Sequence, residues 1–258
     1  MQTLRYEGLR ITNKSSQKVN DALVVEAALQ ININNSPYTV VMRTPGDDSE
    51  LIRGLFYAED IYKKKEKLNI EFIENRKNGF SLINVKIDKN NLGKGYLNKR
   101  TLLSVSSCGI CGKQKLEDIT YEGKKLVDKM NFDTSKLEAM FSEMKKQQDT
   151  FEISGGSHAA SLFDKDYTLL TLKEDIGRHN AVDKVIGHLL NNNTLNQAKC
   201  LLVSGRVSYE IISKAFIAKI PILVAISACS TLAVDFAKEF GICLIGFSRG
   251  TKATIYSR

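Results

Sequence analysis

Residues 200–247 read CLLVSGRVSYEIISKAFIAKIPILVAISACSTLAVDFAKEFGICLIGF, and this stretch alternates short aliphatic runs with helical patterns. The aliphatic runs cover residues 200–203, 221–226 and 242–247. Such continuous apolar runs are typical of strands that are buried on both faces of a sheet. Between them, residues 207–219 and 231–240 carry apolar side chains at helical spacing. This order predicts a largely parallel sheet that is covered by helices on both faces.

The same alternation extends toward the N-terminus. Residues 167–172 are a candidate strand, and residues 178–190 are a candidate helix with one apolar stripe. Before them, residues 136–148 carry a stripe of Leu, Met and Phe side chains, a pattern that favours core packing over a cofactor site. We therefore expect an α/β part over residues 131–258.

The chain before about residue 130 shows strand patterns and one amphipathic helix. The candidate strands lie at 22–33, 38–44, 79–87 and 100–106. Residues 46–49 supply cap residues for a helix that continues to about Tyr62, and the lysine run 63–67 fits its solvated end. We expect a smaller, mixed α+β part over residues 20–130.

Composition and charge narrow the function classes. The chain has 258 residues, five cysteines and a net charge of +8, so it is no disulfide scaffold and an anionic partner fits it. The first twenty residues lack the apolar segment of a signal peptide. The most apolar stretch, residues 221–234, is too short to span a membrane. We expect a cytoplasmic protein with reduced thiols and no membrane or nucleic-acid partner, since the basic and aromatic interleaving of single-strand binders is absent.

A close cysteine pair stands in the sequence SSCGICGK, residues 106–113. Cys108 and Cys111 could share a metal, form a redox disulfide or carry sulfur as a persulfide. Alternatively, they could be incidental residues of a loop without a function of their own. Lys113 and Lys115 favour the thiolate form. No second pair of cysteines has the spacing of a zinc site, so we expect no metal.

Two polar constellations follow. In SGGSHAA, residues 154–160, Gly155 and Gly156 allow a tight turn or a close ligand approach, and His158 is either a polar group in a cleft or a histidine satisfied in that turn. In EDIGRHNAVDK, residues 174–184, the helix would display His179 and Asp183 opposite its apolar stripe. The second motif suits a ligand site at a strand end, or else a charged helix cap with ion pairs.

Three further loops, like residues 174–184, have the composition of ligand-binding segments. Residues 204–208 and 227–231 are small and hydroxylated and precede helices, which suits anion binding. Residues 246–252 read GFSRGTK and could clamp a phosphate or stack on a base. Together with residues 174–184, these loops favour a nucleotide-like ligand.

These stretches together resemble the FdhD family of formate dehydrogenase accessory sulfurtransferases. The resemblance runs from RTPG at residue 43 through SSCGICGK, GGSHAASLFD, EDIGRHNAVDKVIGHLL, SGRVSYEIISKA and SACSTLAVDFA to LIGFSRG, and it covers nearly the whole chain beyond residue 20. It implies a cytidine-deaminase-like, three-layer α/β/α fold for the C-terminal part. The H-x-E zinc signature of true deaminases is absent, which disfavours deamination.

The resemblance also implies a function. Cys108 would carry persulfide sulfur from a cysteine desulfurase, with Cys111 as the second thiol. The sulfur would pass to the molybdenum or tungsten bis(guanine dinucleotide) cofactor, a bound substrate that formate dehydrogenase requires; GDP-like nucleotides are expected in the same pocket.

By the same resemblance, the cofactor would contact residues of three segments. They are Phe247, Ser248, Arg249, Gly250, Thr251 and Lys252, then Arg178, His179 and Asn180, then Gly155 and Gly156 with His158. Asp47 and the pair Cys229 and Ser230 depart from the usual family residues, which affects the detail of the pocket.

Two other functions stay open. The chain could hold the cofactor as a non-enzymatic chaperone, or it could be a thiol-disulfide oxidoreductase. The sequence leaves undecided which metal and which formate dehydrogenase are served, the oligomeric state (a homodimer is one expectation), and whether Cys229 is a third reactive thiol or an inert buried one.

Overall fold

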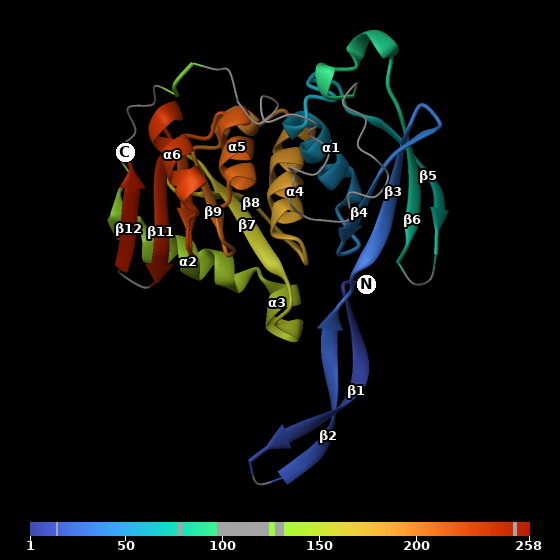
Figure 1. Ribbon diagram of the computed structural model, residues 1–258, viewed down its shortest axis with the longest axis vertical. Helices are drawn as coiled ribbons and strands as arrows, with labels where there is room; N and C mark the ends of the chain where they lie inside the picture. Colours follow the sequence, from blue (N-terminus) through green and yellow to red (C-terminus); the bar gives the residue numbers. More distant parts are fainter. Residues whose placement is uncertain (14, 77–78, 97–123, 127–131, 250–251) are drawn as a thin grey trace.

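The computed structural model describes residues 1–258 except 14, 77–78, 97–123, 127–131 and 250–251. Its strands form three sheets: a six-stranded sheet, a four-stranded sheet and a two-stranded hairpin. Figure 1 shows the two larger sheets side by side and the hairpin projecting away from both.

The six-stranded sheet has the order β12-β11-β10-β9-β7-β8. Its strands are β7 (His158–Phe163), β8 (Leu169–Asp175), β9 (Cys200–Val203), β10 (Ile222–Ala225), β11 (Cys243–Arg249) and β12 (Lys252–Ser257). The central strands β9, β10 and β11 are parallel, as predicted. However, β7 runs antiparallel to both β8 and β9, and β12 runs antiparallel to β11.

The sheet is therefore mixed, and the expectation of a largely parallel sheet is wrong. The reason lies in two short connections, which join neighbouring strands without a crossover helix. One is the turn from Asp164 to Thr168, and the other joins β11 to β12. Strand β12, which follows the predicted strand at 242–247, was not predicted, and His158 begins β7 instead of lying in a turn.

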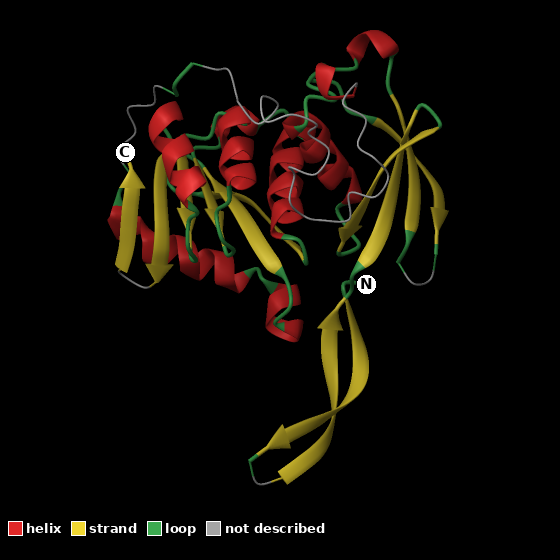
Figure 2. Ribbon diagram, in the orientation of Figure 1, coloured by secondary structure: helices red, strands yellow, loops and turns green. Residues whose placement is uncertain are grey.

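Helices cover both faces of this sheet, so the three-layer α/β/α expectation is confirmed (Figure 2). One face carries α4 (Arg178–Asn191), α5 (Tyr209–Ile217) and α6 (Thr231–Phe240). The other face carries α2 (Leu137–Lys146), whose Leu137, Met140 and Met144 are buried against the strands. The short helix α3 (Asp149–Ser154) follows α2.

The four-stranded sheet has the order β4-β3-β6-β5, with β3 (Ala27–Ile33), β4 (Ser36–Arg43), β5 (Asn69–Asn75) and β6 (Ser81–Lys86). Helix α1 (Asp48–Ala58) shares its hydrophobic core and also packs against α4 of the other sheet. The helices approach closely: a Cβ atom on Gly54 would lie 1.9 Å from the Asp183 carbonyl oxygen, and one on Gly187 would lie 1.8 Å from that of Glu50. Only glycine fits at these crossing points.

Helix α1 differs from its prediction at both ends. Asp47 precedes it with a φ of 55° and makes no side-chain cap bond; its carboxylate instead accepts from Lys173 Nζ at 2.6 Å. The helix ends at Ala58, soon before Asp60 takes a left-handed φ of 55°. The exposed lysine run 63–67 thus follows the helix and is not its end.

The two-stranded hairpin of β1 (Thr3–Thr12) and β2 (Ser15–Val24) was not predicted, and neither was β5. The predicted strand at 22–33 is in fact the end of β2 and the whole of β3. Four single 3-10 turns complete the described elements: Lys89–Asn91, Lys94–Tyr96, Thr134–Lys136 and Leu195–Gln197.

Some predictions cannot be placed on this structure. The strand expected at 100–106 lies outside the described residues, and the boundary expected between residues 130 and 131 falls in the undescribed segment 127–131. Among the residues described, no helix has the length and apolarity needed to cross a membrane.

Candidate functional site

Several predicted site segments meet at one edge of the six-stranded sheet. Strands β9, β10 and β11 end there, and β7 begins there, because β7 runs antiparallel to β9. We call this the carboxyl edge. In open α/β sheets, ligands bind outside the carboxyl ends of the parallel strands.

A basic cluster of His158, Arg178 and Arg206 lies at the carboxyl edge, on the face of the sheet that carries α4. The backbone of Gly205 brings it together: a Cβ atom there would lie 3.3 Å from Arg178 Cδ and 3.3 Å from His158 Nδ1. The Arg178 Nε atom is buried and has no hydrogen-bond partner. Burial first, then the charges of Arg178 and Arg206, lower the pKa of His158. The basic cluster therefore offers two guanidinium groups and a neutral imidazole, a set of groups that suits a phosphate.

An apolar pocket of about 770 Å³ lies at the same edge, on the opposite face of the sheet. It is lined by α2, α3 and the ends of β10 and β11, with Phe141, Met144, Phe151, Ile226 and Ser248 among its residues and Lys145 and Lys146 beside them. The Ser248 hydroxyl is buried without a hydrogen-bond partner. Aromatic walls with one unsatisfied polar group are suited to a flat heterocycle.

The basic cluster and the apolar pocket are separated by the width of a few strands. From β11 to β7 there are three strand spacings, or about 14 Å. The loop after β10 lies between them, where Phe247 N donates to Ser227 O at 3.0 Å. Phe247 itself is 52% exposed and has a φ of 50°. An extended ligand with an aromatic end and a phosphate end could therefore bind across the carboxyl edge.

Cys229 belongs to this loop. A Cβ atom on Gly246 would come within 2.8 Å of its Sγ atom, so the sulfur is held against β11. Burial raises the pKa of the Cys229 thiol to about 11. A thiol with so high a pKa has little thiolate at neutral pH, which favours the inert reading of Cys229.

His179 and Asp183 are not displayed to solvent as expected. Both are buried between α4 and α5: His179 Nε2 lies 3.2 Å from Ser208 Oγ and 3.2 Å from Glu210 Oε2, and Asp183 pairs with Lys214 Nζ at 2.7 Å. Burial, followed by the charge of Arg178, lowers the pKa of His179 to about 3. The imidazole is therefore neutral, and its contact with Glu210 is not an ion pair. The expectation failed because α5 packs over the polar side of α4.

Asn180 also has structural contacts. Its Nδ2 atom donates to Met42 O at 2.8 Å and to Asp175 Oδ1 at 2.9 Å. Asp175 in turn accepts from the Thr44 backbone N–H at 3.2 Å. This part of the 174–184 motif joins the end of β4 to the six-stranded sheet. The motif contains an ion pair, between Lys184 and Asp175, but no side chain caps α4.

The two glycines of residues 154–160 shape the segment between α3 and β7. Gly155 ends α3 with a φ of 65° and has open space around it, whereas a Cβ atom on Gly156 would lie 2.8 Å from Val24 Cγ1 of the hairpin. The Glu174 carboxylate accepts from Thr150 N, from Phe151 N and from Ser157 Oγ, and so caps α3. This segment is thus held in place beside the basic cluster.

Several predicted residues cannot be located. Cys108, Cys111, Gly250, Thr251 and the side chain of Arg249 lie outside the described residues, and Lys252 is exposed at the start of β12. In the part of the chain that the structure describes, no group of three His, Cys, Asp or Glu residues could hold a metal ion.

Sequence reasoning missed the walls of the apolar pocket. The Met and Phe stripe of α2 was assigned to core packing, which holds for the buried Met140 and Met144. However, Phe141 and Met144 also line the pocket, together with Phe151 of α3. The sequence signal that could have indicated the pocket was Phe151, an aromatic residue shortly after the stripe.

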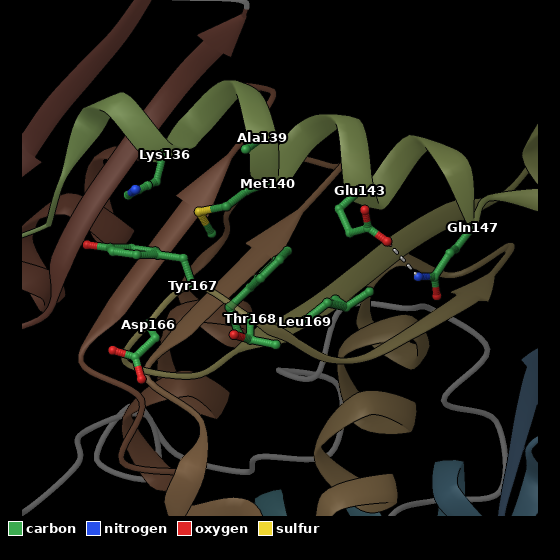
Figure 3. Close-up of a pocket in the computed structure, with 10 residues that line it drawn as sticks. Lys136, Ala139, Met140, Glu143, Gln147, Asp166, Tyr167, Thr168 and Leu169 are labelled. Atoms are coloured by element: carbon green, nitrogen blue, oxygen red, sulfur yellow. Dashed lines mark hydrogen bonds between the residues drawn. The ribbon is translucent and has the colours of Figure 1, made fainter.

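A second pocket of about 550 Å³ lies between α2 and the turn from β7 to β8. Figure 3 shows Lys136, Glu143 and Gln147 on one side of it and Asp166 and Tyr167 on the other. Gln147 Nε2 donates to Glu143 at 3.1 Å. No residue that the sequence predicted for the site lines this pocket.

Comparisons with known proteins agree with the resemblance. Residues 24–258 match the profile of the FdhD/NarQ family. Curated relatives named sulfur carrier protein FdhD include one from Mycolicibacterium paratuberculosis (40% identical, 92% of this chain and 90% of the relative) and one from Saccharolobus solfataricus (37% identical, 98% and 95%). Another, from Streptomyces avermitilis, is 35% identical over 99% of this chain and 94% of its own.

The fold is also shared with a solved structure. A crystal structure from Desulfotalea psychrophila, described as a candidate formate dehydrogenase accessory protein, superposes with a TM-score of 0.79. The superposition covers 100% of this chain and 98% of the other, at 21% identity. With a family profile that spans more than nine-tenths of its length and several relatives above 30% identity, the chain belongs to the FdhD/NarQ family.

Proposed function

We propose that this protein is a sulfurtransferase that carries persulfide sulfur on Cys108 and delivers it to a molybdenum or tungsten bis(guanine dinucleotide) cofactor for formate dehydrogenase. The names of its relatives support sulfur carriage. The choice of substrate rests on two buried polar groups at the carboxyl edge that have no hydrogen-bond partner. The Arg178 Nε atom lies in the basic cluster on one face of the sheet. The Ser248 hydroxyl lines the apolar pocket on the other face.

Loading of the carrier is a sulfur exchange without net oxidation. The Cys108 thiolate attacks the terminal sulfur of a cysteine desulfurase persulfide; a new sulfur–sulfur bond forms on Cys108, and the desulfurase leaves as a thiolate. Lys113 and Lys115 stand close in sequence and favour the attacking thiolate.

Release needs two electrons, because the sulfur reaches the metal as sulfide. Attack of the Cys111 thiolate on the inner sulfur of the Cys108 persulfide supplies them: a Cys108–Cys111 disulfide forms and sulfide leaves for the metal. An external dithiol then reduces the disulfide for another cycle. This step gives the second cysteine of the pair a chemical role.

Recognition of the cofactor uses charge and shape. The basic cluster binds phosphate oxygens through Arg178 and Arg206, and the neutral His158 contributes one hydrogen bond. The apolar pocket takes the guanine base between aromatic side chains, and the base satisfies the Ser248 hydroxyl. GDP, which has one base and one diphosphate, is the simplest probe for this site.

The mass of the intact protein tests the proposal. The protein is incubated with a cysteine desulfurase and cysteine, and its mass is then measured before and after reduction. We expect an increment of about 32 Da, one sulfur atom, that disappears on reduction and maps to Cys108. Binding of GDP without any increment would support a chaperone that only holds the cofactor. Loss of two protons without added sulfur would support a thiol-disulfide oxidoreductase.

A further inference from the structure

The apolar pocket has an acidic end and a basic end along α2. Glu138, Lys145 and Lys146 all line this pocket. Glu138 lies in the first turn of α2, and the two lysines lie in its last turn. An α-helix rises about 1.5 Å per residue, so the carboxylate and the lysines are attached about 10–12 Å apart along the helix axis. Stacking of a base between aromatic side chains does not account for this separation of charge.

The basic end of the pocket is the one that lies toward the basic cluster. From Lys146 the chain continues through Gln148 into α3, as Figure 1 shows, and both Gln148 and α3 line the pocket. Gly155 ends α3, and His158 of the basic cluster begins β7. A ligand that places its phosphates on the basic cluster therefore enters the pocket past the lysines, and Glu138 lies at the far end.

This direction of entry determines which edge of a purine base meets Glu138. The ribose is attached at N9 of the base, and the edge that carries N1 lies on the opposite side. With the ribose at the basic end of the pocket, the N1 edge points toward the acidic end. Glu138 is therefore the charged residue of the pocket that the N1 edge approaches.

The Glu138 carboxylate is available to a ligand. Among the residues that the structure describes, it has no hydrogen bond and no ion pair, whereas Lys146 pairs with Glu143 at 3.4 Å. Phe141, an aromatic wall of the pocket, follows one turn after Glu138 on the same face of α2. A base that stacks on Phe141 therefore has an edge beside the carboxylate.

Purine bases differ in what they offer to a carboxylate at this edge. Guanine presents two donors, N1–H and the 2-amino group, and a carboxylate can accept both in parallel. Hypoxanthine lacks the amino group, and adenine has an acceptor at N1 that would face the carboxylate oxygens. A site built around a hydrogen bond rejects an analogue that lacks it, because the polar group of the site is then left unpaired. The Ser248 hydroxyl cannot make this distinction, since a hydroxyl both donates and accepts.

We propose that Glu138 selects guanine by accepting its N1–H and 2-amino donors, so that the apolar pocket is a guanine site and not a site for any purine. This inference rests on the proposed function, which places the phosphates on the basic cluster. It assigns recognition of the base to a residue outside the three segments that the family resemblance assigns to the cofactor. The two lysines at the other end of α2 face the ribose and the phosphates of the same ligand.

Isothermal titration calorimetry of the full chain with GDP, inosine diphosphate and ADP tests this selection, because the three ligands share the ribose and the diphosphate. We expect the wild type to bind GDP about tenfold or more tighter than ADP, with inosine diphosphate between them. Glu138→Gln should bring the three affinities within about threefold of one another, since an amide can donate to adenine and accept from guanine. Glu152→Gln removes the same charge from the α3 side of the pocket and is the matched control, which should keep the wild-type preference.

Three outcomes would overturn the proposal: equal affinities of the wild type for GDP and ADP, a preference for GDP that survives in Glu138→Gln, or an equal loss of preference in Glu152→Gln. Unchanged circular dichroism of both variants confirms that the fold is intact. Sulfur loading of Cys108 is measured by mass and needs no nucleotide, so a failure of base selection leaves the carrier role standing. A wild type that binds none of the three nucleotides would overturn the selection by Glu138 together with the nucleotide site of the proposed function.

Discussion

Lys184 and Asp175 form an ion pair of 2.8 Å in which neither side chain has any exposed surface. Lys184 Nζ also donates to the carbonyl oxygens of Thr44 and Glu174, and the Thr44 backbone N–H donates to Asp175. The pair therefore connects the end of β4 to β8 and α4. A buried charge survives at such a place only when every partner is present.

Removal of one partner should be costly. We expect Lys184→Met to lower the free energy of unfolding by about 3–5 kcal/mol, because it leaves the Asp175 carboxylate buried and uncompensated. Urea denaturation measures the change. Lys173→Met, which breaks the more exposed pair with Asp47, is the matched control and should cost about 1 kcal/mol or less. Equal losses in both variants would contradict this account of the buried pair.

Arg178 should contribute to nucleotide binding rather than to stability. Arg178→Gln removes a guanidinium group from the basic cluster and should weaken GDP binding by about tenfold or more, since hydrogen bonds to charged groups are worth about 1.5–3 kcal/mol. Isothermal titration calorimetry measures the affinity. Lys238→Gln changes the same charge on the exposed face of α6 and serves as the control. An Arg178→Gln variant that binds GDP like the wild type would place the phosphates elsewhere.

The Ser248 hydroxyl should contribute to GDP affinity but not to the free energy of unfolding. Its hydroxyl is buried without a partner, so Ser248→Ala should leave the free energy of unfolding unchanged or raise it slightly. GDP affinity should fall by about threefold to tenfold, the equivalent of one neutral hydrogen bond. Ser161→Ala removes another unpartnered buried hydroxyl, in β7 and away from the apolar pocket, and should leave GDP affinity unchanged. If both alanine variants bind GDP equally well, the base does not reach Ser248.

His179 should make the fold sensitive to acid. Its pKa is about 3 in the folded protein and near 6.5 when unfolded, so between these values the unfolded chain binds more protons. Stability from this residue is therefore complete above pH 6.5 and is lost as the pH falls toward 3. His179→Gln should reduce the loss by up to about 1.4 kcal/mol per pH unit in this window. Urea midpoints at pH 7, 6, 5 and 4 measure the two slopes, and parallel slopes would count against a neutral buried imidazole.

Cys108 should carry sulfur, whereas Cys229 should serve only in packing. Cys108→Ala should abolish sulfur loading and the maturation of formate dehydrogenase without unfolding the protein. Cys229→Ala should load normally, since the raised pKa of Cys229 leaves little thiolate at neutral pH. Intact mass spectrometry and dehydrogenase activity in cells measure both. Full activation of the dehydrogenase by the Cys108 variant would refute the carrier role.

Sequence patterns predicted best where burial is complete. The strand Cys200–Val203 and the helix Thr231–Phe240 have the predicted ends, because both are apolar on the side that faces the core and are bounded by clear breaks. The β1–β2 hairpin was missed because its residues are mostly exposed and show no buried face. Strand β7 was not predicted either, because His158 and the small residues after it were assigned to a turn or ligand motif.

The site residues were predicted by type more reliably than by role. Residues 174–184 were expected to display polar groups, but the side chains of Asp175, His179 and Asp183 are buried in contacts with the end of β4 and with α5. No local sequence pattern reveals these contacts. Arg178, in contrast, keeps an unpartnered buried Nε atom within the basic cluster. Contacts between segments far apart in sequence decided which of these polar side chains stay available to a ligand.

The glycine contacts between α1 and α4 have a consequence for how the molecule unfolds. Each helix belongs to the core of a different sheet, and at Gly54 and Gly187 the two backbones touch without any side chain between them. Separation of the two sheets would expose the contact surface of both helices. We therefore expect the two sheets to unfold together in a single transition.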